Sequence, residues 1–214
     1  MKLLVVHRDD LVDERRRCQQ RLRWHLYQLD PTLTVPPGAL DRAIQLERVG
    51  RWLARCNQAV QVRIARDLVA RCRSVGRAIA ELERELATLT AGMAPALLEL
   101  PGCGALTAAK LLCEIGPIDR FQTEAQLARH SGVAPLEASS GRTRRHRLDR
   151  GGNRQLNCAL HRIAVTQARM HPPARAYLER KKTEGKSRRE AIRCLKRQLA
   201  RVVFNTLKTN PTLT

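Results

Sequence analysis

The chain has 214 residues, of which 40 are Lys or Arg and 20 are Asp or Glu, so its formal net charge is +20. This length accommodates one sizeable domain or two small ones, and the strongly basic balance predicts a polyanionic partner. Aromatic residues make up only 3% of the chain, which argues against a base-stacking platform for single strands. No apolar run approaches the ~20 residues of a membrane span, and we expect neither a membrane anchor nor a signal peptide.

Helices are expected throughout, in an all-α fold. We place the first helix at residues 8–29, where five apolar residues share one side and prolines follow, and the second at residues 39–55. The five apolar residues are Leu11, Cys18, Leu22, Leu26 and Leu29. Carboxylates near the start of the first helix are expected to cap it and to complement its dipole. They are Asp9, Asp10, Asp13 and Glu14.

Residues 57–90 contain no proline and one glycine, Gly76. Apolar residues recur there at steps of three and four, which is typical of a coiled-coil or long-hairpin seam. Such a seam favours a homo-oligomer, although the helix can equally fold back on its neighbours. We assign residues 1–92 to a helical linker and coiled-coil region and residues 93–214 to a second, compact helical domain. The seam residues are Ile64, Leu68, Cys72, Val75, Ile79, Leu82, Leu86 and Leu89.

A glycine-rich turn, Leu-Pro-Gly-Cys-Gly at 100–104, precedes a helix-forming run and predicts a helix-hairpin-helix unit. Gly102 and Gly104 can adopt a positive φ or let a backbone come close to a ligand. The free amides and the dipole at the start of the next helix favour phosphate. We therefore expect Gly102, Gly104, Thr107 and Lys110 to bind nucleic acid, the alternative being an ordinary turn between packed helices.

Residues 131–152 are rich in Ser, Gly and Arg and are expected to form a long loop. We expect a helix over 123–130 before this loop, one over 153–170 after it that is capped by Asn153, and a helical segment at 174–182. Ser187-Arg188-Arg189-Glu190 has the pattern of a capping box that opens a last helix. The basic side chains of that helix are expected either to bind nucleic acid or only to keep the protein in solution.

The charge is unevenly distributed, since residues 141–201 hold 19 Lys and Arg against 4 Asp and Glu. This segment predicts contacts with nucleic-acid phosphates that weaken steeply with salt. The alternative is a solvated basic face.

Seven cysteines and six histidines form no ligand pattern, so we expect neither a zinc site nor a disulfide framework, and no metal bound by this chain. We interpret the cysteines as small buried hydrophobes of a cytoplasmic protein.

Five motifs occur in order between residues 95 and 208. They are Leu-Pro-Gly-Cys-Gly with its following Thr-Ala (100–108), Ile-Asp-Arg-Phe (118–121), Gly-Val-Ala-Pro (132–135), Ser-Ser-Gly (139–141) and, after an Arg-rich segment, Gly-Asn-Arg-x-Leu (152–156). Together they resemble the C-terminal domain of bacterial insertion-sequence transposases of the "one-ten" class. Relatives of this family include the Piv and MooV DNA invertases and the bridge-RNA-guided recombinases.

The resemblance implies part of a recombinase that acts on double-stranded DNA. Family members join an N-terminal RuvC-like domain, whose four acidic residues hold Mg²⁺, to a C-terminal domain that supplies a serine nucleophile. That serine precedes the glycine of the Ser-Gly motif, which here is Ser140, and it attacks the DNA backbone to form a phosphoserine link. In some relatives a guide RNA selects the target, so the resemblance allows a guide RNA as a partner here.

The residues around Ser140 suit this chemistry. A serine hydroxyl is a weak nucleophile that needs activation, and neighbouring arginines can neutralise the charge that builds on the phosphorus oxygens. Ser139 is a rival nucleophile, and His146 is a weaker candidate for the base. Without the resemblance, Ser139-Ser140-Gly141 is an ordinary turn. The arginines expected to bind nucleic acid are Arg142, Arg144, Arg145, Arg147, Arg150 and Arg154.

The sequence departs from the family because no RuvC-like domain is recognisable in it. We therefore expect a truncated or split transposase that needs a separate RuvC-like domain, with its Mg²⁺, for activity. A rival hypothesis is a non-catalytic helix-hairpin-helix module that only binds nucleic acid. A third hypothesis is a purely structural helical protein.

Overall fold

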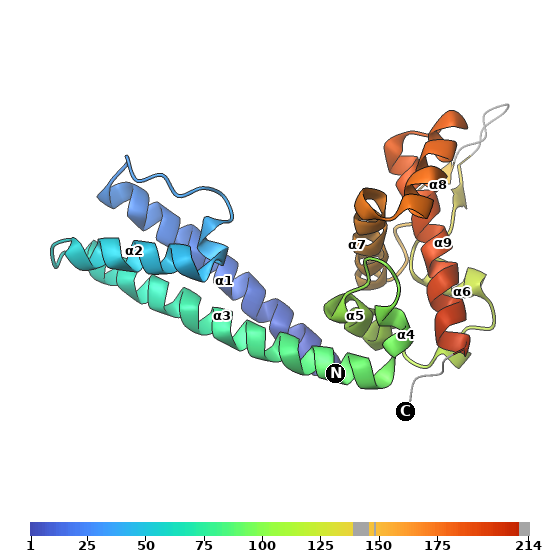
Figure 1. Cartoon of the computed structure of the whole chain (residues 1–214), viewed down its shortest axis with the longest axis horizontal. Coiled ribbons are helices and arrows are strands. Elements are labelled where there is room, and N and C mark those ends of the chain that lie inside the picture. Colours follow the sequence, from blue (N-terminus) through green and yellow to red (C-terminus); the bar gives the residue numbers. More distant parts are fainter. Residues whose placement is uncertain (139–145, 148, 210–214) are drawn as a thin grey trace. The chain divides into compact units, whose positions relative to one another are not determined.

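The structure, a computed structural model, describes residues 1–138, 146–147 and 149–209. Helices dominate these residues, which confirms the all-α fold class (Figure 1). The chain divides into two compact units, residues 3–85 and the residues from 86 onward together with residues 1–2. Helix α3 (Val60–Met93) contributes to both units. None of the described helices is both long enough and apolar enough to cross a membrane.

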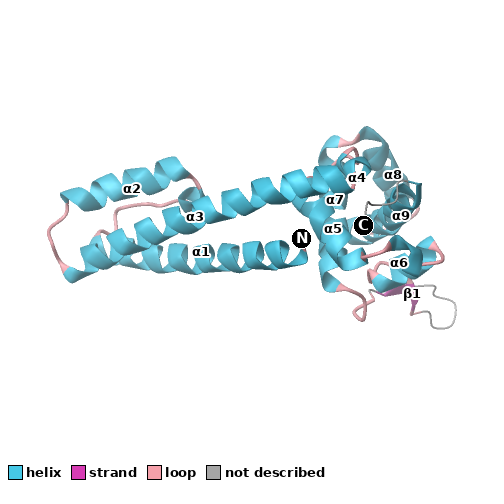
Figure 2. Cartoon of the chain, turned by 90° about the horizontal axis from the view of Figure 1, so that it is seen from below, coloured by secondary structure: helices cyan, strands magenta, loops and turns pink. Residues whose placement is uncertain are grey.

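The N-terminal unit consists of α1 (Lys2–Leu29), a 3₁₀ turn (Ala39–Asp41), α2 (Ala43–Arg55) and the first part of α3. Figure 2 shows α1 and α3 side by side, and the ion pair between Glu14 and Arg71 links them. The apolar face of α3 packs against α1 and α2 around the fully buried Leu22 and Leu53. Most of the predicted seam is therefore buried within this chain, although Leu89 is exposed, while a homo-oligomer stays a prediction.

The structure corrects the capping role expected for four carboxylates of α1. The helix already begins at Lys2 and has no acidic residue in its first turn, so these carboxylates lie beyond the reach of the free amides. Three of the four form ion pairs with arginines instead. The four carboxylates are Asp9, Asp10, Asp13 and Glu14.

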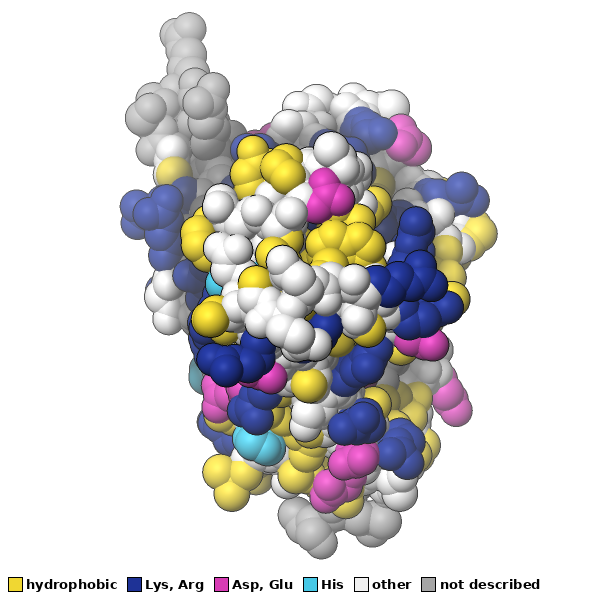
Figure 3. All heavy atoms as spheres, turned by 90° about the vertical axis from the view of Figure 1, so that its left-hand side faces the viewer, with side chains coloured by type: hydrophobic (Ala, Val, Ile, Leu, Met, Phe, Trp, Pro, Cys, Tyr) yellow, Lys and Arg dark blue, Asp and Glu magenta, His cyan; other side chains and the backbone are white. Residues whose placement is uncertain are grey.

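Basic side chains of the N-terminal unit also serve as internal donors. Arg66 donates to the carbonyl of Leu53 at 2.8 Å, and Arg23 donates to the carbonyl of Val35 at 2.8 Å. Figure 3 shows one face of the molecule, on which Lys and Arg side chains are spread among hydrophobic and acidic ones.

The C-terminal unit is a helical cluster in which α7 and α9 pack against each other and contact the remaining helices. Its core is mainly aliphatic, around the fully buried Leu156 and Ile163, and it also contains Phe121 and Phe204. The helices are α4 (Pro95–Leu98), α5 (Ala105–Ile115), α6 (Glu124–His130), α7 (Arg154–Met170), α8 (Pro172–Thr183) and α9 (Arg188–Thr209), with a 3₁₀ turn at Ile118–Arg120.

The capping box is confirmed at the start of α9. The backbone N–H of Ser187 donates to Glu190 Oε2 at 2.9 Å, and the N–H of Glu190 donates to Ser187 Oγ at 3.4 Å. These reciprocal bonds satisfy two amides that a helix N-terminus otherwise leaves free.

The cysteines follow the expectation only in part. Cys18, Cys72 and Cys103 are buried, and burial raises the pKa of the Cys103 thiol to about 12. Cys158 is exposed, because the buried positions of α7 are 156, 159, 160 and 163 and position 158 falls on the other side of that helix. Its interpretation as a buried hydrophobe was wrong.

Candidate nucleic-acid interface

Asn153 connects α7 to two other helices of the C-terminal unit. Its Oδ1 accepts from the N–H groups of Gln155 at 2.9 Å and Leu156 at 3.0 Å, which confirms the predicted N-cap. Its Nδ2 donates to Glu114 Oε2 on α5 at 2.6 Å, and its own N–H donates to the His130 carbonyl at the end of α6. The start of α7 is therefore fixed against both helices.

Two motif glycines lie back to back beside this cap. Gly132 has φ +62°, and a Cβ added to Gly152 would lie 2.2 Å from the Gly132 backbone nitrogen. Only hydrogen fits at these positions, since any side chain would overlap backbone atoms. The close contact holds the residues after α6 against those before α7.

Asp149 anchors the chain shortly before this junction. It is 7% exposed, its Oδ1 accepts from the Gly151 N–H at 2.9 Å, and its Oδ2 lies 3.4 Å from Arg129 Nη1. Buried carboxylates are expected to be paired or hydrogen-bonded in this way.

A short antiparallel ribbon lies within the stretch that the sequence predicted to be loop. Strand β1 (Leu136–Glu137) pairs with β2 (His146–Arg147), with Leu136 opposite Arg147 and Glu137 opposite His146. Two-residue strands carry no hydrophobic periodicity, so the pattern did not indicate them. Of the residues between the strands, 139–145 lie outside the described part, and with them the predicted nucleophile Ser140, its rival Ser139, and Arg142, Arg144 and Arg145.

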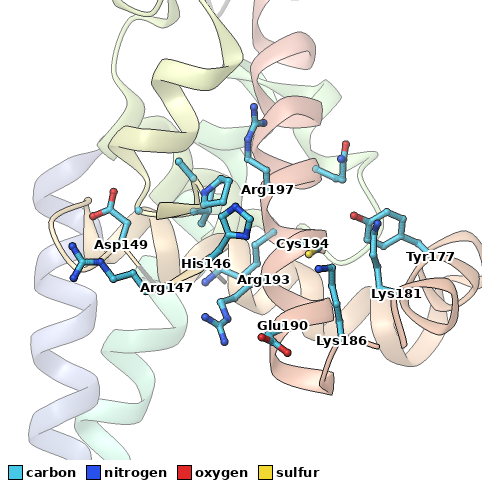
Figure 4. Close-up of a pocket in the computed structure, with 16 residues that line it drawn as sticks. His146, Arg147, Asp149, Tyr177, Lys181, Lys186, Glu190, Arg193, Cys194 and Arg197 are labelled. Atoms are coloured by element: carbon cyan, nitrogen blue, oxygen red, sulfur yellow. The ribbon is translucent and has the colours of Figure 1, made fainter. Parts of the chain in front are cut away.

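A cavity of about 270 Å³ lies between this ribbon, the residues after α6, and helices α8 and α9 (Figure 4). Six Lys or Arg residues line it, against two acidic residues, Asp149 and Glu190. The six are Arg147, Lys181, Lys186, Arg193, Lys196 and Arg197.

Lys196 is the buried cation of this cavity, with 5% of the residue exposed. Its ammonium donates to Asn157 Oδ1. The Asn157 amide in turn donates to the carbonyls of Ser131 at 3.0 Å and Gly132 at 2.9 Å. Burial lowers the pKa of Lys196, and the nearby charge of Arg193 lowers it further, because both disfavour the charged form.

The predicted nucleic-acid residues fall in several places. Arg147 lines the cavity, whereas Arg150 and Arg154 are exposed outside its lining. Gly104 is the N-cap residue of α5 and provides no side-chain hydrogen bond to the first amides of that helix. The residues of the predicted hairpin, namely Gly102, Gly104, Thr107 and Lys110, do not line the cavity.

Within the predicted hairpin, packing accounts for two of these residues. Gly102 has φ +83°, and a Cβ there would lie 2.9 Å from Thr166 Cβ on α7, so this glycine permits close helix packing. Lys110 is only 8% exposed. The alternative of a turn between packed helices thus describes Gly102, while phosphate binding at α5 stays a prediction.

Sequence reasoning did not single out the cavity residues of α8 and α9. A signal was present, since Arg193, Lys196 and Arg197 are spaced at i, i+3 and i+4 and therefore share one face of a helix. The sequence does not separate the buried from the exposed basic residues of the last helix, and so it does not show that Lys196 is buried.

The described residues bring together no group of three or more His, Cys, Asp or Glu side chains able to hold a metal ion. The cavity is lined instead by six basic side chains, which only donate hydrogen bonds.

Comparisons with known proteins relate the chain to insertion-element proteins. Residues 94–179 match the model of the transposase IS116/IS110/IS902 family. The chain is 38% identical over 117 residues to an uncharacterized 43.6 kDa protein of insertion element IS110 from Streptomyces coelicolor, over 54% of this chain and 29% of that protein.

Two further relatives cover more of the chain. An uncharacterized 44.8 kDa protein of insertion element IS116 from Streptomyces clavuligerus is 25% identical over 97% of this chain and 63% of its own length. An uncharacterized 42 kDa protein of insertion element IS900 from Mycobacterium paratuberculosis is 29% identical over 82% of this chain and 44% of its own length. The chain thus spans less than two thirds of each relative, and the part of its C-terminal unit at residues 94–179 is similar to the transposase domain of the IS116/IS110/IS902 family.

Proposed function

We propose that this chain binds double-stranded DNA and supplies the serine nucleophile for DNA transposition. The match of residues 94–179 to the transposase family carries this proposal. The basic cavity beside the ribbon supports it independently, because a cluster of Lys and Arg is what a protein needs to hold a DNA backbone.

Ser140 is the proposed nucleophile, and it lies in the sequence between the two strands of the ribbon. Its Oγ attacks a backbone phosphorus, the bond from phosphorus to the leaving deoxyribose oxygen breaks, and the hydroxyl proton ends on that oxygen. The phosphoserine link conserves one phosphodiester bond for rejoining. The arginines that follow Ser140 in the sequence, Arg142, Arg144, Arg145 and Arg147, stabilise the charge that develops on the phosphorus oxygens.

We propose further that activity requires a RuvC-like domain together with its Mg²⁺, and we assign the Mg²⁺ site to that domain. Guide RNA is the further component that the resemblance allows in the same assembly.

A covalent adduct tests the nucleophile. The full chain is mixed with donor and target DNA, a RuvC-like domain, Mg²⁺ and any flanking RNA, and protein-linked DNA is detected on a denaturing gel. We expect an adduct from the unmodified chain and from Ser139→Ala, and none from Ser140→Ala. An adduct that persists in Ser140→Ala and disappears in Ser139→Ala would transfer the role to Ser139.

The rival function is a module that binds nucleic acid without chemistry. It predicts retarded DNA in a gel-shift titration at low salt and no adduct under any condition. The absence of retarded DNA at low salt would contradict both binding functions and leave the purely structural one.

A further inference from the structure

The cavity carries more positive charge than its own surroundings neutralise. Four of its cations form no ion pair within the described residues, namely Arg147, Lys186, Arg193 and Lys196. A charge held away from water is costly unless it is paired. For Lys196 no ion pair among the described residues offsets this cost, and its ammonium donates to the neutral Asn157 amide oxygen.

The two carboxylates of the cavity are already engaged. Glu190 accepts from the backbone N–H and the hydroxyl of Ser187, and Asp149 accepts from Gly151 and pairs with Arg129. The hydrogen bonds from Ser187 lower the pKa of Glu190 most, and the nearby charges of Arg193 and Lys186 lower it further. These two acids therefore leave a net positive cavity.

We propose that this cavity binds one phosphate group of the DNA backbone. The inference rests on the proposed function and adds the place where the backbone is held. The volume of about 270 Å³ lies below the range of drug-sized pockets, so it suits a single small group. Guanidinium and ammonium groups only donate hydrogen bonds, and a phosphate offers several acceptor oxygens to them.

The walls of the cavity favour a phosphate over a base. Among Phe, Tyr and Trp, the described lining contains Tyr177 alone, and that ring already has Arg180 5.2 Å and Lys181 5.6 Å from its centre. A ring covered by cations is a poor platform for stacking a base. The contact therefore fixes the position of the DNA without reading its sequence.

A matched pair of variants on α9 tests the site in the full chain. Arg193→Gln removes a cavity cation, and Arg188→Gln removes an exposed cation of the same helix that does not line the cavity. Binding of a fluorescein-labelled DNA duplex is followed by anisotropy over a series of salt concentrations. We expect Arg193→Gln to weaken binding roughly tenfold and to reduce the salt slope by about 0.9, and Arg188→Gln to change affinity less than about twofold.

Equal effects of the two variants would overturn the cavity inference while leaving the proposed function in place. If the unmodified chain binds no duplex at low salt, the proposed function and the inference both fail. Circular dichroism spectra that match the unmodified chain ensure that a loss of binding is not a loss of folding.

Protection of lysines from acetylation is a second test of the site, and it uses the chain without substitutions. Lys186 lines the cavity, and Lys182 on α8 does not. We expect duplex DNA to slow acetylation of Lys186 several-fold, as measured by mass spectrometry, and to leave Lys182 unchanged. Equal protection of the two lysines would contradict the inference, as would protection of Lys186 by single-stranded RNA but not by duplex DNA.

Discussion

The two units of the molecule use their arginines differently. In the N-terminal unit, Arg71 pairs with Glu14 and Arg66 donates to a backbone carbonyl, so these cations have partners within the unit. Around the cavity of the C-terminal unit, Arg147 and Arg193 have no ion-pair partner among the described residues. Exposed arginines of the N-terminal unit such as Arg17 and Arg48 also lack an ion-pair partner among the described residues, so the comparison teaches that neither net charge nor a missing partner alone locates a phosphate site. What singles out the proposed site is that several such cations line one cavity.

The largest expected effect comes from removing the support of the cavity. We expect Gly152→Ala to lower the free energy of unfolding by at least ~3 kcal/mol, because its Cβ would overlap the Gly132 backbone, which has no flexible end to move. Urea unfolding of the full chain measures this loss. Gly92→Ala is the control, since a Cβ there meets nothing within 4 Å. A Gly152→Ala protein as stable as the control would refute the structural role of the glycine contact.

The N-cap of α7 is the next support of the cavity. We expect Asn153→Ala to cost about 2 kcal/mol, since it removes two bonds to helix amides and the hydrogen bond from Asn153 to Glu114. Urea unfolding again gives the value. Gln155→Ala is exposed and keeps the cap, so a similar loss in that variant would argue against the assignment.

One buried thiol in each unit allows the pH dependence of the free energy of unfolding to be compared between the two units. Burial raises the pKa of Cys103 to about 12 and that of Cys72, in the N-terminal unit, to about 11. Each folded thiol stays protonated while the unfolded thiol ionises above its ordinary pKa of 9.0. The stabilisation is therefore complete below pH 9 and is lost as the pH rises toward the folded pKa.

Because each thiol ionises in the unfolded chain and not in the folded one, we expect each to lower the free energy of unfolding by about 1 kcal/mol between pH 8 and pH 10. The loss is measured by urea unfolding of the unmodified chain, with Cys103→Ala and Cys72→Ala as comparisons. Each variant should lose less stability over this interval than the unmodified chain does. An unchanged pH dependence in Cys103→Ala would contradict the burial of that thiol.

In the N-terminal unit a glycine has no such packing role, which sharpens the contrast with Gly152. A Cβ added to Gly76, within α3, meets nothing within 4 Å. We therefore expect Gly76→Ala to raise the free energy of unfolding by about 0.5–1 kcal/mol through helix propensity alone. A loss of stability on urea unfolding would show that the helix needs glycine there.

The sequence predicted the helices well because their signals are local. The caps at Asn153 and Ser187 are recognisable from a few neighbouring residues, and the seam of α3 is recognisable from the spacing of its apolar residues. The cavity depends instead on contacts between distant segments, such as Lys196 with Asn157 and Gly132 with Gly152. Local pattern reveals that a residue is basic or small, but not which distant surface it faces.

The smallest expected effect comes from an arginine of the N-terminal unit. Arg71 is 59% exposed and pairs with Glu14, and exposed ion pairs contribute little to stability. We expect Arg71→Gln to cost at most ~0.5 kcal/mol and to leave the salt slope of DNA binding unchanged, although it removes the same charge as Arg193→Gln. If the anisotropy titration shows an equal drop in slope for both variants, both units bind the DNA backbone, and internal pairing does not distinguish structural arginines from binding ones.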